Sequence, residues 1–103
     1  MNKKKFFQII QKTYQKIEKK IEKKFLNYDI EIIQHENILT IEFSNLKKII
    51  FTTQQYLNQL WMATYKQGYH FEYNKNLWRC MRTKKKLFKI LNFICLYYTQ
   101  KKK

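Results

Sequence analysis

Side chains able to bind a metal tightly or to act as nucleophiles are sparse in this chain of 103 residues. Cys80 and Cys95 are too few and too far apart in sequence to build a zinc cluster, so we expect buried, reduced thiols. His70 stands alone between two aromatic residues, where a histidine is more often a surface hydrogen-bonding group than a ligand. His35 has the neighbours of a solvated turn residue. No serine, cysteine or histidine has a plausible orienting partner, so the sequence predicts a protein that is not an enzyme.

Glu18 and Glu22 are two carboxylates at helical spacing. In a helix their Cβ atoms would lie roughly 5 to 6 Å apart, close enough to share a cation. An ordinary solvated helix face explains the same pair, and Lys19 lies three residues before Glu22, within reach of its carboxylate. Taken alone, the residues favour the solvated face.

The net charge is +15, but the composition makes this charge poor evidence for nucleic-acid binding. Lysine, isoleucine, asparagine, phenylalanine and tyrosine supply 57 of the 103 residues, and their codons are rich in A and T. Mutational pressure therefore explains much of the lysine excess. A small basic RNA-binding or ribosome-associated module remains an alternative. Against it, only Arg79 and Arg82 are arginines, and the lysines decorate both predicted helices instead of lining one strand face.

The length and the apolar runs predict one cytoplasmic domain, residues 1–103. The run Phe6–Ile10 is too short and too polar to be a targeting segment. Leu87–Tyr98 is apolar but shorter than the roughly 20 residues that span a bilayer, so we expect a core helix there and no membrane partner.

Apolar residues recur at helical spacing near both ends of the chain. The first stripe predicts a helix over about residues 3–25, with Asn2 as its cap. The second predicts a helix over about residues 85–100. The two stripes are Phe6, Ile10, Tyr14, Ile17, Ile21 and Phe25, and then Leu87, Ile90, Leu91, Ile94 and Tyr98.

Between the two helices, about residues 29–82, apolar and polar residues alternate as in strands. Six strands are predicted: Asp29–Gln34, Ile38–Phe43, Lys48–Thr52, Leu57–Ala63, Tyr69–Tyr73 and Leu77–Arg82. Consecutive strands with terminal helices favour an α+β sandwich, with the helices on one face of a mainly antiparallel sheet and the other face wet. Leu60 and Met62 share one side of their strand, which places Gln59 and Trp61 on the other. Parity alone leaves a register shifted by one residue open.

The chain carries a strand, a glycine loop and an aromatic strand in a distinctive order. The segments are QLWMA (Gln59–Ala63), GYHFEY (Gly68–Tyr73) and a strand that holds Trp78 and Cys80. In this order the sequence resembles the frataxin family, and its bacterial CyaY branch most closely. The resemblance runs nearly end to end, although the flanking helices match only in pattern. It implies a frataxin-like sandwich with a six-stranded sheet.

The resemblance also implies a function: a non-catalytic, iron-binding adapter that supports or regulates iron–sulfur cluster assembly. The implied partners are a cysteine desulfurase and the scaffold protein, with nucleic acid not expected to bind specifically. The side chains implied to face the partners are Gln59, Trp61 and, less securely placed, His70. Those implied to hold ferrous or ferric iron, weakly and reversibly through oxygen ligands, are Glu18, Glu22, Asp29 and Glu31.

The first helix departs from the family pattern in charge. Lysines occupy positions where that pattern carries acidic or polar residues, namely Lys3, Lys5, Lys19 and Lys23, and Asn2–Leu26 holds nine lysines against two glutamates. A lysine about 6 Å from a bound cation costs roughly 0.7 kcal/mol per unit of cation charge even at the dielectric of water. We therefore expect weaker iron binding than is usual in the family. The resemblance also implies that the first helix meets a basic patch on the cysteine desulfurase, and a lysine-rich helix would repel such a patch. Either the desulfurase has changed its own charge, or binding relies on the Trp61 face.

Overall fold

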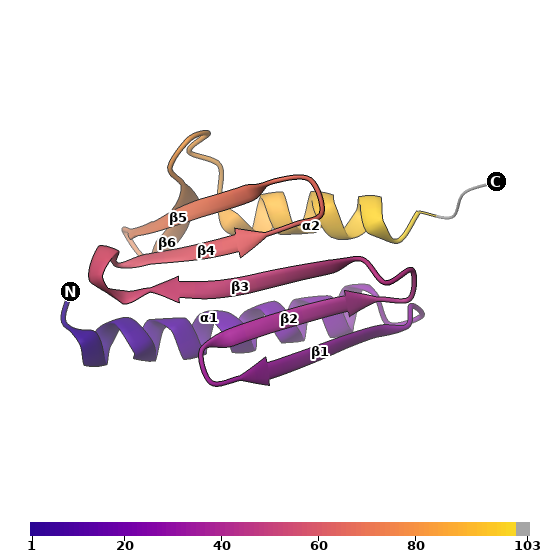
Figure 1. Cartoon of the computed structure of the whole chain (residues 1–103), viewed down its shortest axis with the longest axis horizontal. Helices are drawn as coiled ribbons and strands as arrows, with labels where there is room; N and C mark the ends of the chain where they lie inside the picture. The colour runs from indigo at the N-terminus through magenta and orange to yellow at the C-terminus, as the bar shows by residue number, and fades with distance from the viewer. Residues whose placement is uncertain (101–103) are drawn as a thin grey trace.

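A six-stranded antiparallel sheet, with strand order β1-β2-β3-β4-β5-β6, carries both helices on one face (Figure 1). The structure, a computed structural model, describes residues 1–100, so the last three residues of the predicted 1–103 domain lie outside it. The elements are α1 (Lys3–Lys24), β1 (Ile30–His35), β2 (Ile38–Phe43), β3 (Lys48–Gln54), η1 (Gln55–Leu57), β4 (Gln59–Ala63), β5 (Gly68–Asn74), β6 (Leu77–Cys80) and α2 (Leu87–Tyr98). The predicted α+β sandwich is confirmed.

Helix α1 follows the predicted apolar stripe. The Asn2 side chain caps it by accepting a hydrogen bond from the Lys5 N–H at 2.8 Å. The helix ends one residue before the predicted Phe25, which is its C-cap and donates its N–H to the Ile21 carbonyl. The stripe is buried throughout, at Phe6, Ile10, Tyr14, Ile17, Ile21 and Phe25.

Helix α2 is a core helix, as predicted, but it is shorter than the predicted 85–100. Lys86 forms a β-bridge with Arg79, and the Cys80 N–H donates to the Lys85 carbonyl at 2.9 Å, so these residues extend the sheet instead of starting the helix. Its buried side chains are Leu87, Ile90, Leu91, Ile94, Cys95 and Tyr98. Over residues 1–100, no helix combines the length and apolar character needed to cross a membrane.

The strands match the six predicted segments, with differences at their ends. β4 begins at Gln59 and not at Leu57, because Gln55–Leu57 form a 3-10 turn and Asn58 takes a left-handed φ of 53°. β6 ends at Cys80, before a turn that the sequence placed inside the strand. His35 is the last residue of β1 and not a turn residue.

The core lies between the sheet and the helices and contains one buried polar side chain, Thr13, among residues 1–100. Its hydroxyl accepts a hydrogen bond from Trp78 Nε1 at 2.8 Å and donates to the Ile9 carbonyl at 2.7 Å, which ties α1 to β6. Both thiols are free and buried, as expected. Desolvation raises the pKa of Cys95 to about 12 against the lowering effect of Lys24. Desolvation is the largest influence on Cys80 and raises its pKa, but hydrogen bonds from Thr83 and Arg82 and the Arg82 charge together outweigh it and leave the pKa of Cys80 below its usual value.

Candidate functional site

The face of the sheet that the helices leave uncovered carries Gln59, Trp61 and His70. Leu60 and Met62 are buried toward the helices, so the alternation along β4 turns Gln59 and Trp61 to the open face. Trp61 is half-buried and His70 is exposed. The register shifted by one residue, which sequence parity left open, is therefore excluded.

Two contacts fix the orientation of the Trp61 indole. Trp61 and His70 are directly paired between β4 and β5, and their rings stack at a centroid distance of 4.1 Å and an interplanar angle of 8°. The indole Nε1–H donates to Gln59 Oε1 at 2.8 Å. A ring already held in place loses less conformational freedom when a partner covers it. The three predicted partner-binding residues thus form one cluster.

The sequence interpretation missed two neighbours of this cluster. Thr52 pairs with Trp61 from β3. Met81 follows β6, donates its N–H to the His70 carbonyl at 2.9 Å, and places its sulfur 3.1 Å from Gln59 Nε2. The pairing of adjacent antiparallel strands was the available signal for both, because it fixes which residues lie opposite Trp61 and His70.

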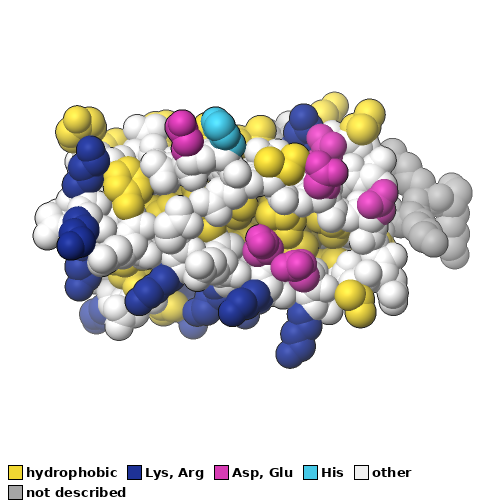
Figure 2. All heavy atoms as spheres, turned by 90° about the horizontal axis from the view of Figure 1, so that it is seen from below, with side chains coloured by type: hydrophobic (Ala, Val, Ile, Leu, Met, Phe, Trp, Pro, Cys, Tyr) yellow, Lys and Arg dark blue, Asp and Glu magenta, His cyan; other side chains and the backbone are white. Residues whose placement is uncertain are grey.

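The four predicted iron ligands lie on neighbouring elements. Glu18 is half-buried and Glu22 is exposed on α1, whereas Asp29 precedes β1 and Glu31 lies on it, both exposed. Figure 2, which views the molecule from below, shows Asp and Glu side chains spaced over that side, with Lys and Arg mostly along its left and lower margins. Within residues 1–100 no three Asp, Glu, His or Cys side chains gather closely enough to hold an ion. Over the described residues, the arrangement therefore offers pairs of surface carboxylates and no enclosed metal centre.

A fifth carboxylate, Glu42, was not among the predicted iron ligands. It lies directly opposite Glu31 across β1 and β2, where like charges repel. Lys48 offsets this repulsion with an ion pair to Glu42 at 3.2 Å. Alternation along β1 and β2, which puts Glu31 and Glu42 on the open face, was the signal for it. Within the described part of the chain, the ion pair considered between Lys19 and Glu22 is absent.

Comparison with known proteins agrees with this geometry. The sequence model of the family described as "Frataxin-like domain" matches residues 1–101. Iron–sulfur cluster assembly protein CyaY of Buchnera aphidicola subsp. Baizongia pistaciae is 40% identical over 93 residues, which is 90% of this chain and 79% of that protein. The protein of the same name from Psychromonas ingrahamii is 42% identical over 78 residues, covering 76% of this chain and 72% of the relative.

A solved structure agrees as well. The frataxin from Psychromonas ingrahamii superposes with a TM-score of 0.89 at 35% sequence identity, over 96% of this chain and 92% of that one. The sandwich, the strand order and the open face are thus shared across most of both molecules. The two relatives above carry the name CyaY, and the chain belongs to the frataxin-like family.

Proposed function

We propose that this protein is a non-catalytic, iron-binding adapter that supports or regulates iron–sulfur cluster assembly in the cytoplasm. Family membership and the names of its relatives support the pathway. The observation that carries the proposal is the Trp61 indole, which is fixed by Gln59 and His70 on the open face. The partners proposed for that face are the scaffold protein and the cysteine desulfurase.

Trp61 has the properties of an interface anchor. Tryptophan supplies a large, rigid contact area, and anchors of this kind contribute about 2 kcal/mol or more to binding. Here the indole N–H is already satisfied by Gln59, so a partner that covers the ring leaves no unpaired donor. Loss of the side chain should therefore weaken partner binding by about 30-fold.

Iron binding is proposed at the carboxylate pairs Glu18 with Glu22 and Asp29 with Glu31. Carboxylate oxygens suit ferrous and ferric iron, and exposure of most of these groups gives the ion easy access. Lysines interleave with the acidic residues on α1, at Lys19 and Lys23 among others, and raise the free energy of any bound cation. The proposed affinity is accordingly low, and iron is cargo to be exchanged.

The docking proposal is tested by reconstituting cluster formation on the cognate scaffold and desulfurase, with and without this protein, and by pull-down of both partners. Trp61→Ala should abolish the change in rate and most of the binding. Phe93→Ala is the matched control, since Phe93 is 71% exposed but lies on α2, on the helix side. Equal binding by the Trp61 variant and the parent would refute the docking face. No change in rate with the parent protein would remove the proposed function.

The iron proposal is tested by anaerobic titration with ferrous iron. Glu18→Lys with Glu22→Lys should lower the affinity further, whereas Glu36→Lys with Glu72→Lys makes the same change in net charge away from the proposed ligands. Micromolar affinity that survives the first pair of substitutions would defeat the assignment of ligands. Equal losses from both pairs would show that net charge alone governs the binding.

A further inference from the structure

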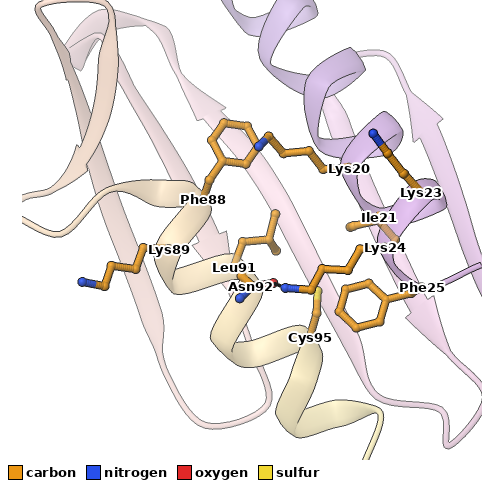
Figure 3. Close-up of a pocket in the computed structure, with 10 residues that line it drawn as sticks. All are labelled: Lys20, Ile21, Lys23, Lys24, Phe25, Phe88, Lys89, Leu91, Asn92 and Cys95. Atoms are coloured by element: carbon orange, nitrogen blue, oxygen red, sulfur yellow. Dashed lines mark hydrogen bonds between the residues drawn. The ribbon is translucent and has the colours of Figure 1, made fainter.

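A groove of about 690 Å³ runs between α1 and α2 (Figure 3). It lies on the helix side of the sheet, whereas Trp61 lies on the open face. We refer to it as the interhelical groove. Its apolar lining comes from Ile21, Phe25, Leu91 and Cys95, which are at most 6% exposed. Burial keeps the Cys95 thiol neutral by raising its pKa to about 12, so the lining carries no charge of its own.

The rim of the interhelical groove is made of lysines. Figure 3 shows Lys20 and Lys24 reaching from α1 across the groove toward α2, with Lys23 and Lys89 extending away from it at the rims. The Lys20 ammonium lies 5.1 Å from the Phe88 ring centroid, and the Lys24 ammonium donates a hydrogen bond to the Asn92 side chain. Both ammonium groups therefore have neutral partners, and a carboxylate would form a stronger, charge-assisted bond with either.

Within residues 1–100, no Asp or Glu lines the groove or balances the charge of its rim. Glu18 and Glu22 occupy a different face of α1, offset by two residues from Lys20 and Lys24. The sequence contains no Asp or Glu after Glu72, so α2 contributes none. The three lysines that end the chain carry the same charge as the rim.

From this combination we infer a second binding site: the interhelical groove takes an acidic, leucine-rich segment of a partner protein. Aliphatic side chains would cover the apolar lining, and flanking carboxylates would pair with Lys20 and Lys24, replacing the hydrogen bond to Asn92. The site is separate from the proposed Trp61 face, so a partner could occupy both at once. The inference does not depend on the proposed iron ligands.

Two other anionic partners fit the groove less well. A single-stranded nucleic acid gains affinity by stacking its bases on exposed aromatic rings, whereas the one ring above the groove floor, Phe88, is covered by the ammonium groups of Lys16 and Lys20 at 5.6 and 5.1 Å. A membrane surface is broad and meets convex apolar surfaces, not a concave groove between two helices. A peptide segment is narrow enough to enter the groove, and it can present apolar side chains to the lining and carboxylates to the lysine rim.

The probe for this site is a fluorescein-labelled, end-capped peptide with the sequence Glu-Leu-Leu-Glu-Glu-Leu-Leu-Glu, and binding is measured by fluorescence anisotropy at physiological ionic strength. Lys20→Gln with Lys24→Gln should weaken binding about tenfold or more, because two charge-assisted contacts are lost. The matched control is Lys3→Gln with Lys4→Gln, which removes the same charge at the far end of α1 and should change the affinity less than about threefold. A peptide with serine at every leucine position should bind at least tenfold more weakly than the parent peptide.

Several results would overturn the inference. They are equal losses in the two lysine variants, equal binding of the serine peptide, and absence of binding by the parent peptide. Displacement of the peptide by dodecanoate or by phosphatidylglycerol vesicles, with either binding more tightly, would assign the groove to a lipid anion. A tighter complex with a single-stranded RNA octamer, sensitive to the same Lys20 and Lys24 changes, would assign it to nucleic acid. Backbone amide shifts of labelled protein confined to α1 and α2 would support the peptide assignment independently of the variants.

Discussion

The stack between Trp61 and His70 should contribute to stability in a way that a double-mutant cycle can isolate. The cycle uses Trp61→Thr, His70→Thr and the double variant, because threonine keeps the preference for an extended strand and removes both rings. The two rings lie directly opposite each other, nearly parallel, with their centroids 4.1 Å apart. Either single substitution therefore removes the whole stacking contact.

The size of the coupling follows from this geometry. Stacked aromatic pairs contribute about 0.5–1.5 kcal/mol beyond the area they bury, and cross-strand pairs in general about 0.2–1 kcal/mol. Because Trp61 is half-buried and His70 is exposed, solvent already reaches part of the pair, and we expect a coupling of about 0.5–1 kcal/mol. Urea unfolding followed by far-UV circular dichroism gives the free energy of unfolding for each of the four proteins.

A second cycle provides the control. Thr40 lies on the same face of β2, two strands from Trp61 and so roughly 10 Å away, and Thr40→Ala should add to Trp61→Thr without coupling. A Trp61–His70 coupling below about 0.3 kcal/mol, or one no larger than the control, would show that the stack does not hold the indole. The indole would then not be preorganised for docking by its stack with His70, whatever the binding assays give.

Three further predictions concern the core and the surface. Thr13→Val should lower the free energy of unfolding, measured in urea, by about 1–3 kcal/mol, because Trp78 Nε1 loses its hydrogen-bond acceptor. Thr13→Ser keeps the hydroxyl and should lower the free energy of unfolding less. A Val variant as stable as the parent would contradict this. The folded-state pKa of Cys95 is raised from 9.0 to about 12, so its contribution is complete below pH 9 and is lost as the pH rises to 12, by about 1.4 kcal/mol per pH unit. Cys95→Ala should remove that slope in urea titrations at pH 8 to 10, below the range in which the buried Tyr14 phenol, whose pKa is also raised, adds a slope of its own; an unchanged slope would refute it. Lys47→Ala should destabilise by about 1 kcal/mol or more in thermal melts, because its ammonium lies 5.1–5.9 Å from three tyrosine rings, and Lys47→Met should lose less; equal stability of all three proteins would contradict this.

Periodicity in the sequence predicts the elements of this fold well and their ends less well. The helical stripe from Phe6 to Phe25 and the alternation along each strand arise because one face of each element is buried. The spacing of apolar residues in the sequence therefore predicts these elements directly. The ends depend on local geometry that the pattern does not record. Asn58 delays β4 by taking a left-handed φ, and the bridge between Lys86 and Arg79 delays α2.

The candidate site, too, could be predicted from the sequence only in part. Alternation predicts that Gln59 and Trp61 share a face, but the register of β4 with β5 is needed to set His70 against the indole. Register also places Glu42 opposite Glu31, a relation between strands that no single stretch of sequence contains. The interhelical groove is a further step removed, because it arises from how α1 and α2 pack side by side on the sheet.

The bond between Thr13 and Trp78 joins residues 65 positions apart, and the chain is made from the Thr13 end. At roughly 5–20 residues per second, about 3–13 s of synthesis separate the first helix from the strand that completes its cover. During that interval the apolar stripe of a newly made helix stays open to water and to other nascent chains. The nine lysines around the stripe should keep such chains apart by mutual repulsion. The excess positive charge would then act during synthesis on the ribosome as well as in the folded protein.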